Sequence, residues 1–365
     1  MRVQRVSSLD IVDQSWTVVG SDWLPVMPVE TFLAHLTDQR RSPNTVKAYA
    51  HDLKDYFEYL LARDLVWDLV RYDELARFKP WLQLSGAGRR GEISVLPSMA
   101  SACTESTINR KLAAVTSFYQ FHLRHGVDLA LTIRGAGRSV ASTSSSFRPF
   151  LVHVRRSRPQ RSDLRLRQPT RHPQVLSDEQ VGELVAACGH LRDQVLLRLL
   201  NDSGMRIGEV LGLRHEDIMT ADGTINVRSR VNANGARAKT WERSIPVNPG
   251  WFRLHAEYLH SEYGDLDSDY VFITLWSKPV GRALSYSAVS DLFHRLTQRT
   301  GVFVTPHMFR HSYATRMLRA GVKAEVVQKL LGHASVSTTI DTYAHLGIED
   351  VREQLVRAGL LPDSD

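Results

Sequence analysis

The stretch from Thr305 to His345 constrains this chain more than any other part of the sequence, because it gathers histidines, arginines and a tyrosine around short predicted helices. Pro306 is tolerated in a first helical turn, where its missing N–H would have had no partner in any case. Gly321 and Gly332 interrupt the helical pattern. The stretch therefore predicts one helix on each side of Gly321, with the polar side chains of both helices brought together at one site.

The chemistry of this stretch is that of a site for phosphate groups. His307 and Arg310 lie three residues apart, so on a helix both side chains leave the same face. The following helix is expected to end at Gly332 and to expose His333, and the last segment is expected to bring Tyr343 back to the same site. Positive donors, proton carriers and one potential nucleophile are thus concentrated together. That helix has a predicted apolar stripe made of Val322, Val326, Val327, Leu330 and Leu331.

A second group of polar residues lies about a hundred residues upstream. The apolar run RDQVLLRLLNDSG predicts a buried helix that ends at Gly204. Arg206 follows in the turn, and Glu209 lies three residues further on; an Arg–Glu pair that only caps a helix is the alternative interpretation. The segments TINVRSRV and GARAKTWERSIPV then alternate apolar and polar residues, which predicts a small antiparallel sheet with Lys239 near a turn.

Three motifs in this order, SGMRIGEVLGLRHEDI, HMFRH and LLGHASVSTTIDTYAH, resemble the signature of the tyrosine recombinases, also called phage-integrase-type recombinases. The resemblance implies a site-specific DNA recombinase that breaks and rejoins strands through a 3′-phosphotyrosyl intermediate, with no cofactor and no metal. It implies supporting roles for Glu209 and His311. The residues that it marks as catalytic are Arg206, Lys239, His307, Arg310, His333 and, as the nucleophile, Tyr343.

These residue types suit the reaction. Planar guanidinium groups such as those of Arg206 and Arg310 bind phosphate oxygens in pairs and stay charged at any working pH. A lysine among other cations, here Lys239, has a lowered pKa and can protonate the leaving alkoxide. Histidines can donate to the non-bridging oxygens or pass protons. Tyr343 would attack to give a covalent intermediate.

Bulk properties agree with a DNA-binding protein of two domains. The 365 residues carry a net charge of +7, and 43% of them are hydrophobic; a basic surplus favours polyanions such as nucleic acid. No apolar run is long enough to cross a bilayer, so we expect a cytoplasmic, nucleoid-associated protein. Cys103 and Cys188 lack zinc-type spacing and are interpreted as reduced thiols.

The chain order predicts a mainly α protein. Residues 1–22 are interpreted as an extended lead-in, 23–128 as a helical domain, 129–173 as an Arg-rich linker and 174–365 as a mostly helical catalytic domain with a small antiparallel sheet and a C-terminal helix. By resemblance, residues 23–128 form the all-helical, SAM-like core-binding domain that clasps DNA.

Two helix starts and the linker are the predicted DNA contacts. Ser42-Pro43 begins one helix and TESTINRKLAAVTSFYQF holds the start of another; both starts are polar and basic, and a solvated helix end is the alternative interpretation. A flexible charged segment is the alternative for the linker. The predicted contacts are Asn44, Thr45, Lys47, Thr107, Arg110, Lys111, Arg155, Arg156 and Arg158.

The biological role is predicted less sharply than the chemistry. Length and linker favour integration or excision of a mobile element, and a Xer-like resolvase of chromosome or plasmid dimers is the alternative within the family. A non-catalytic DNA-binding regulator and a type IB topoisomerase-like enzyme are the alternatives from other classes. By resemblance, the partners are double-stranded DNA with paired sites and three further copies of the chain, which is a monomer when free; accessory or partner recombinase proteins are also expected.

Overall fold

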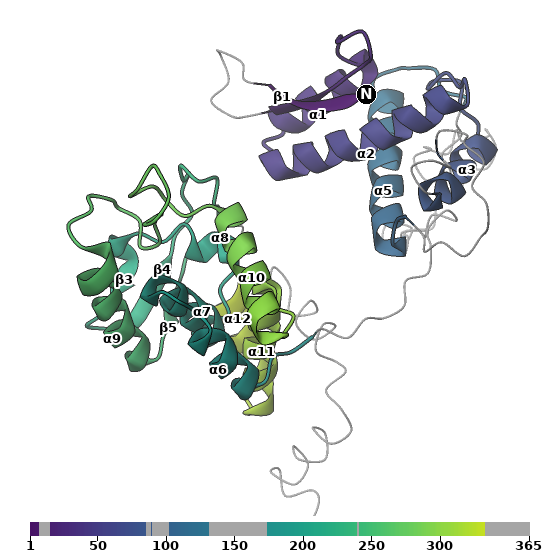
Figure 1. Ribbon diagram of the computed structural model, residues 1–365. Helices are drawn as coiled ribbons and strands as arrows, with labels where there is room; N and C mark the ends of the chain where they lie inside the picture. The colour runs from purple at the N-terminus through teal and green to yellow at the C-terminus, as the bar shows by residue number, and fades with distance from the viewer. Residues whose placement is uncertain (7–14, 85–88, 90–101, 131–173, 239–240, 333–365) are drawn as a thin grey trace, which may run out of the picture. The chain divides into compact units, whose positions relative to one another are not determined.

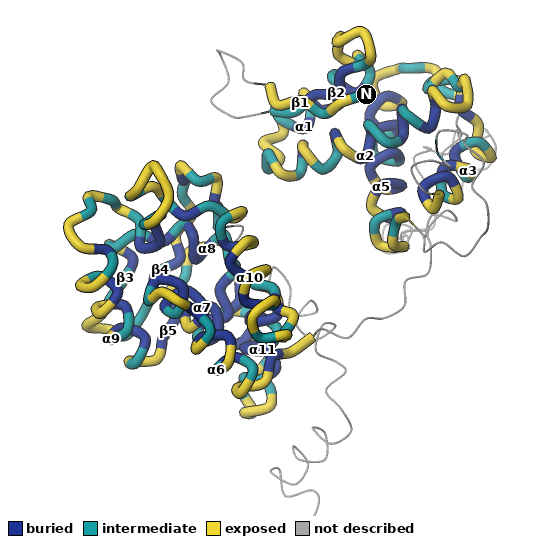
Figure 2. The backbone as a smooth tube through the Cα atoms, in the orientation of Figure 1, coloured by how far each residue is buried: buried dark blue, intermediate teal, exposed yellow. Residues whose placement is uncertain are grey.

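The chain divides into two compact units, Met1–Thr170 and Arg171–Asp365, each of which has its own buried core (Figure 1, Figure 2). The structure, a computed structural model, describes residues 1–6, 15–84, 89, 102–130, 174–238 and 241–332. The division lies inside the predicted linker, whose residues from 131 onward are outside the described part.

Unit 1 is a small antiparallel sheet with helices around an aromatic core. Its start differs from the expected lead-in: two strands pair there, with Arg2 opposite Val19, and the second strand packs on the first two helices. The first strand is exposed along nearly its whole length and the second ends in three consecutive buried residues, so neither shows the alternation of buried and exposed positions by which a strand is predicted. The described elements are β1 (Arg2–Val6), β2 (Ser15–Val19), α1 (Met27–Asp38), α2 (Pro43–Ala62), α3 (Tyr72–Gln83) and α5 (Glu105–Arg124).

The start of α2 forms as predicted. The Ser42 hydroxyl accepts the backbone N–H of Thr45 at 3.2 Å, and Pro43 occupies the first turn. Further along, the buried rings of Tyr56 and Tyr119 join α2 to α5 through a hydroxyl–hydroxyl hydrogen bond of 2.6 Å. The interface of these two helices thereby fixes how their polar starts are held relative to each other.

Unit 2 is mostly helical with a three-stranded antiparallel sheet, which confirms the predicted fold class. The sheet has the order β3-β4-β5, with Ile225 opposite both Ile218 and Ile245. Its strands are β3 (Ile218–Met219), β4 (Thr224–Val227) and β5 (Arg243–Pro246). Its helices are α6 (Asp178–Ala186), α7 (Leu191–Ser203), α8 (Ile207–Val210), η1 (His215–Asp217), α9 (Pro249–Tyr258), η2 (Leu259–Tyr263), α10 (Tyr286–Thr300), α11 (Pro306–Arg319) and α12 (Ala324–Leu331).

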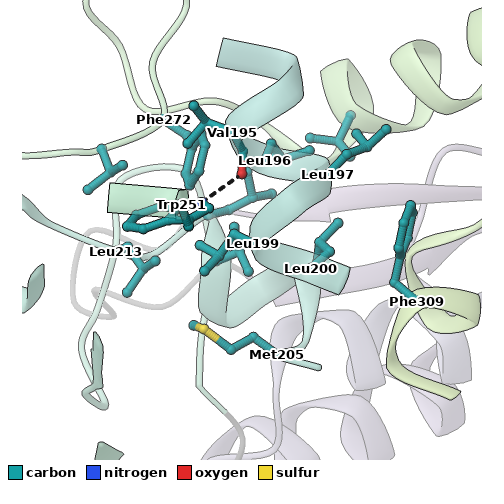
Figure 3. Packing of buried hydrophobic residues seen from close by; sticks show 14 of the residues in the cluster. Val195, Leu196, Leu197, Leu199, Leu200, Met205, Leu213, Trp251, Phe272 and Phe309 are labelled. Carbon is teal, nitrogen blue, oxygen red and sulfur yellow. Dashed lines mark hydrogen bonds between the residues drawn. The ribbon is translucent and has the colours of Figure 1, made fainter. Parts of the chain in front are cut away.

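Helix α7 is the buried centre of unit 2, as its apolar run VLLRLL predicts. Figure 3 shows its side chains packed with Trp251 of α9 and Phe309 of α11 around them. The Trp251 indole N–H donates to the Val195 carbonyl at 3.0 Å, which satisfies a polar group inside the core. The fully buried hydrophobic side chains of α7 are Val195, Leu196, Leu197, Leu199 and Leu200.

The predicted apolar stripe of α12 is narrower in the structure. Val327 and Leu331 are buried against α11, whereas Val326 is 47% exposed and Leu330 is half-buried. A short helix packed on one neighbour buries only the positions that face it. Gly332 ends the helix in the left-handed conformation, with φ of 66°, as predicted.

Within the described ranges, no helix is both long and apolar enough to cross a bilayer.

Gly204 should be intolerant of a side chain. Its φ is 60°, and a Cβ there would lie 2.5 Å from Cδ1 of Tyr313 and 3.0 Å from Cδ2 of Leu331. We expect Gly204→Ala to lower the free energy of unfolding by about 3 kcal/mol, the left-handed strain and the overpacking together. Gly301, the equivalent cap of α10, has a φ of 72° and open space around it, so Gly301→Ala should cost only about 1 kcal/mol. Equal losses in urea unfolding would contradict the packing argument.

Unit 2 should lose stability in mild acid through His255. Its ring stacks on Trp251, and burial lowers the pKa of His255 to about 4, with the neighbouring His215 adding to the shift. Because the unfolded chain binds this proton near pH 6.5, stability falls as the pH drops from about 6.5 to 4, by roughly 3 kcal/mol. His255→Phe keeps a ring and removes the titration, so its unfolding free energy should depend less on pH over this window. Parallel pH curves for the two proteins would refute the assignment.

Candidate active site

Arg206 is held in the turn between two helices of unit 2. Helix α7 ends at Gly204, whose left-handed conformation redirects the chain, and Arg206 then serves as the N-cap of α8. Its guanidinium donates to three acceptors: Glu209 Oε1 at 3.2 Å, the Leu331 carbonyl at 3.3 Å and the Gly332 carbonyl at 3.2 Å. The predicted placement of Arg206 beside a buried helix is correct.

Glu209 is the buried acid of this site. Its side chain is 0% exposed and contacts two arginines. Oε1 accepts from Arg206 at 3.2 Å and from Arg243 at 3.3 Å; Oε2 accepts the Arg206 backbone N–H at 3.0 Å and Arg243 at 2.8 Å. Burial by itself would raise the pKa of Glu209, but the hydrogen bonds and charge of Arg243, with those of Arg206, bring that pKa below its usual value. The carboxylate is therefore ionised at neutral pH.

Arg310 reaches the same point from α11. It is buried, and it donates to the Gly204 carbonyl at 3.0 Å and to the Leu331 carbonyl at 2.8 Å. The Leu331 carbonyl thus accepts from both Arg206 and Arg310, which brings the two predicted arginines together although 104 positions separate them. Carbonyls at the end of a helix lack intrahelical partners and carry partial negative charge, so they attract cations.

The histidines of α11 lie beside Arg310. His307 is exposed in the first turn and His311 is half-buried one turn later, with 6.5 Å between their ring centroids. Tyr313, in contrast, is buried, and burial raises its pKa. That agrees with its interpretation as a core residue.

Three of the six predicted catalytic residues are outside the described residues: Lys239, His333 and Tyr343. The described chain comes close to two of them in sequence. Residues 238 and 241 flank the gap that contains Lys239, and the Gly332 carbonyl, which Arg206 contacts, belongs to the residue before His333. The predicted linker contacts Arg155, Arg156 and Arg158 are also outside the described residues.

Around the predicted DNA contacts of α2, Asn44 and Lys47 are exposed and Thr45 is half-buried. The Lys47 ammonium lies 4.6 Å from the centroid of the Trp16 ring, a cation–π contact. The start of α2 therefore presents an exposed charge that rests on a ring of β2.

Lys111 of α5 differs from its expected exposed position. Its side chain is 7% exposed, and its ammonium pairs with Asp52 at 3.2 Å and Asp55 at 2.6 Å. Arg110 also pairs with Asp52, yet its side chain stays 52% exposed, and Thr107 is half-buried in the first turn. Of the two basic residues, Arg110 is exposed, and Lys111 is enclosed and joins α5 to α2.

Sequence reasoning missed Arg243 and Asp52 as members of these clusters. The signal for Arg243 was its position at the start of a predicted strand, in the context RSIP. The signal for Asp52 was a carboxylate one position before Leu53 of the predicted apolar face of α2. Neither pattern says which distant charge the side chain meets.

The arrangement can bind an anion. Two guanidinium groups at one helix end are suited to the paired oxygens of a phosphodiester, and exposed His307 lies on the same helix as Arg310. In the part of the chain that the structure describes, no three His, Cys, Asp or Glu side chains are grouped as metal ligands.

Comparisons with known proteins place both units. Residues 174–349 match the phage integrase family, and residues 29–126 match its N-terminal SAM-like domain. Transposase A from transposon Tn554 of Staphylococcus aureus is 35% identical over 359 residues, which cover 97% of each chain. Tyrosine recombinase XerC of Roseiflexus sp. (strain RS-1) is 30% identical over 329 residues, covering 87% of this chain and 88% of the relative.

Solved structures share the fold. The Tn1549 transposon integrase in complex with transposon right end DNA aligns with a TM-score of 0.58 and 17% identity, covering 91% of this chain and 99% of that one. A lambda integrase dimer bound to a core site aligns with a TM-score of 0.56 and 15% identity, covering 88% and 96%. With 35% identity over nearly its whole length and both domains matched, the chain belongs to the phage integrase family and is a tyrosine-type DNA recombinase.

Proposed function

We propose that this recombinase moves a mobile genetic element, by cleaving and rejoining double-stranded DNA in the cytoplasm at paired sites. The observation that carries the chemistry is the meeting of Arg206 and Arg310 at the Leu331 carbonyl, two residues before His333. The 35% identity over 97% of the Tn554 transposase supports the mobile-element role. The 30% identity to a XerC protein supports dimer resolution as the second candidate.

In the proposed reaction, Tyr343 Oη passes its proton to His307 or His333 and attacks the phosphorus atom, so that the P–Oη bond forms while the P–O5′ bond breaks. Lys239 gives its proton to the departing 5′ oxygen, and the phosphate stays esterified to the 3′ end of the strand. Arg206 and Arg310 offset the charge on the non-bridging oxygens, with His307 and His333 as further donors. Attack by the 5′-hydroxyl of another strand reverses these bond changes, so the bond energy is conserved.

Unit 1 and the linker supply the proposed contacts to the duplex. The starts of α2 and α5 would meet the phosphate backbone, and the linker arginines would add affinity without reading sequence. Four copies of the chain would assemble on two sites, each cleaving one strand. The proposed contacts at the helix starts are Asn44, Thr45, Lys47, Thr107 and Arg110.

The nucleophile is tested with a nicked suicide substrate that carries an end of the element. The wild-type protein should give a covalent protein–DNA band on a denaturing gel, and Tyr343→Phe should give none, because the attacking oxygen is absent. Tyr313→Phe, a buried tyrosine of the core, is the matched control and should keep the band.

The other outcomes separate the alternatives. Equal bands from wild type and Tyr343→Phe would mean that another tyrosine attacks. A mobility shift without any covalent band would favour a DNA-binding regulator. Relaxation of any supercoiled plasmid, without paired sites, would favour topoisomerase-like activity.

The linker contacts are tested by the salt dependence of binding. Replacing Arg155, Arg156 and Arg158 with serine should make the slope of log affinity against log salt shallower by up to about 3, because each lost phosphate contact accounts for roughly 0.9. The control removes three exposed arginines distant from the proposed helix-start contacts: Arg63, Arg77 and Arg124. If both triple variants change the slope equally, the linker has no special contact with DNA.

A further inference from the structure

Arg243 is the one arginine of the buried cluster that the proposed reaction does not use. It begins β5, where it pairs with Val227, and its side chain is only 4% exposed, against 24% for Arg206. Arg310 is as deeply buried, but its terminal nitrogens lie on neutral carbonyls, whereas both terminal nitrogens of Arg243 lie on the Glu209 carboxylate, so the charge of Arg243 is already matched within the protein. Any effect of Arg243 on the reaction therefore passes through its neighbours.

Those contacts join three elements of unit 2. The two terminal nitrogens of Arg243 form a fork on Glu209, at 3.3 Å to Oε1 and 2.8 Å to Oε2, and its Nε donates to the Leu330 carbonyl at 2.7 Å. Glu209 in turn holds Arg206 by its side chain and its backbone N–H. One guanidinium thus fixes β5 to α8 and to the last turn of α12.

We propose that Arg243 is a positioning residue for DNA cleavage, which acts through Glu209 to aim Arg206 and at the same time fixes the turn of α12 that precedes His333. This inference rests on the proposed function. Arg206 by itself holds the Glu209 carboxylate through one backbone N–H and one side-chain contact, which leave Oε1 and the Arg206 guanidinium able to shift together. The fork from Arg243 onto both carboxylate oxygens removes that freedom.

The geometry requires arginine and not merely a positive charge. Three directed N–H groups serve three acceptors on two elements, and a lysine ammonium, which is a point charge on a flexible stem, cannot form the planar fork. Arg243 also follows Lys239 by four positions in the sequence. The side chain that orients Glu209 therefore also anchors the strand next to the proposed general acid.

A purely structural ion pair is the competing explanation, because breaking any buried pair destabilises a fold. Arg192 offers a matched control. It is also buried, donates twice to Asp193 Oδ1 and once to the Ile273 carbonyl, and has no described hydrogen bond to Glu209. Arg192→Lys should cost stability in the same way without disturbing Arg206.

The test measures the rate of covalent adduct formation on the suicide substrate with DNA bound to saturation. We expect Arg243→Lys to slow this rate about 100-fold, as a displacement of a catalytic group on the order of 1 Å does, while the affinity for DNA changes less than about threefold. Arg192→Lys should keep the wild-type rate. The rate is read from the time course, and its final amplitude counts the active molecules, so loss of folded protein does not imitate a slow rate.

Two further measurements separate positioning from stability. Glu209→Gln combined with Arg243→Gln should be no slower than the slower single variant, because both changes break one connection. In Arg243→Gln the acid limb of the rate profile should move to higher pH, since Glu209 loses a cation and its pKa rises; a general loss of stability would not move that limb. Glu209→Asp, which withdraws the carboxylate by one methylene, is the second variant if Arg243→Lys does not fold.

Each result supports or overturns a defined claim. A wild-type rate in Arg243→Lys, or equal slowing in Arg192→Lys, would overturn the positioning role and leave the proposed function standing. Additive effects in the double variant would also overturn it. Absence of an adduct from the wild-type protein would instead refute the proposed function.

Discussion

The last turn of α12 is the point on which the site depends. Its carbonyl oxygens, at Leu330, Leu331 and Gly332, accept hydrogen bonds from Arg243, Arg206 and Arg310. Three guanidinium groups would repel one another in this small volume. The free carbonyls of a helix end and the buried Glu209 carboxylate offset that repulsion, so the cations can be held close together before any phosphate is present.

The rest of unit 2 fits around this turn. Helix α7 is the buried centre of unit 2 and brings Gly204 under the site, where the Tyr313 ring and Leu331 leave no room for a Cβ. Arg310 then spans from the Gly204 carbonyl to the Leu331 carbonyl. One side chain, Arg310, thereby joins the end of the core helix α7 to the end of the short helix α12. A small shift of either helix would therefore move the guanidinium groups of the site.

The sequence was sufficient for features with local causes. Pro306, Gly204 and Gly332 mark helix ends by backbone chemistry, and the structure has those ends where they were predicted. It was not sufficient for contacts between distant charges. Lys111 reads as a solvated helix start, but a carboxylate 59 positions earlier, Asp52, draws it inside. Arg243 reads as a strand residue, and only the fold brings it to Glu209.

The two units use buried carboxylates in opposite ways. In unit 1, Asp52 and Asp55 pair with the enclosed Lys111 ammonium, and these ion pairs join α5 to α2. In unit 2, one buried carboxylate, Glu209, orients Arg206 while leaving that side chain 24% exposed. The difference lies in the ratio of charges around each cation: Lys111 pairs with two carboxylates and is enclosed, whereas Glu209 is shared by two arginines and leaves Arg206 partly exposed. A phosphodiester is therefore the natural complement of the partly exposed cations, Arg206 in unit 2 and Arg110 in unit 1, and not of the enclosed Lys111.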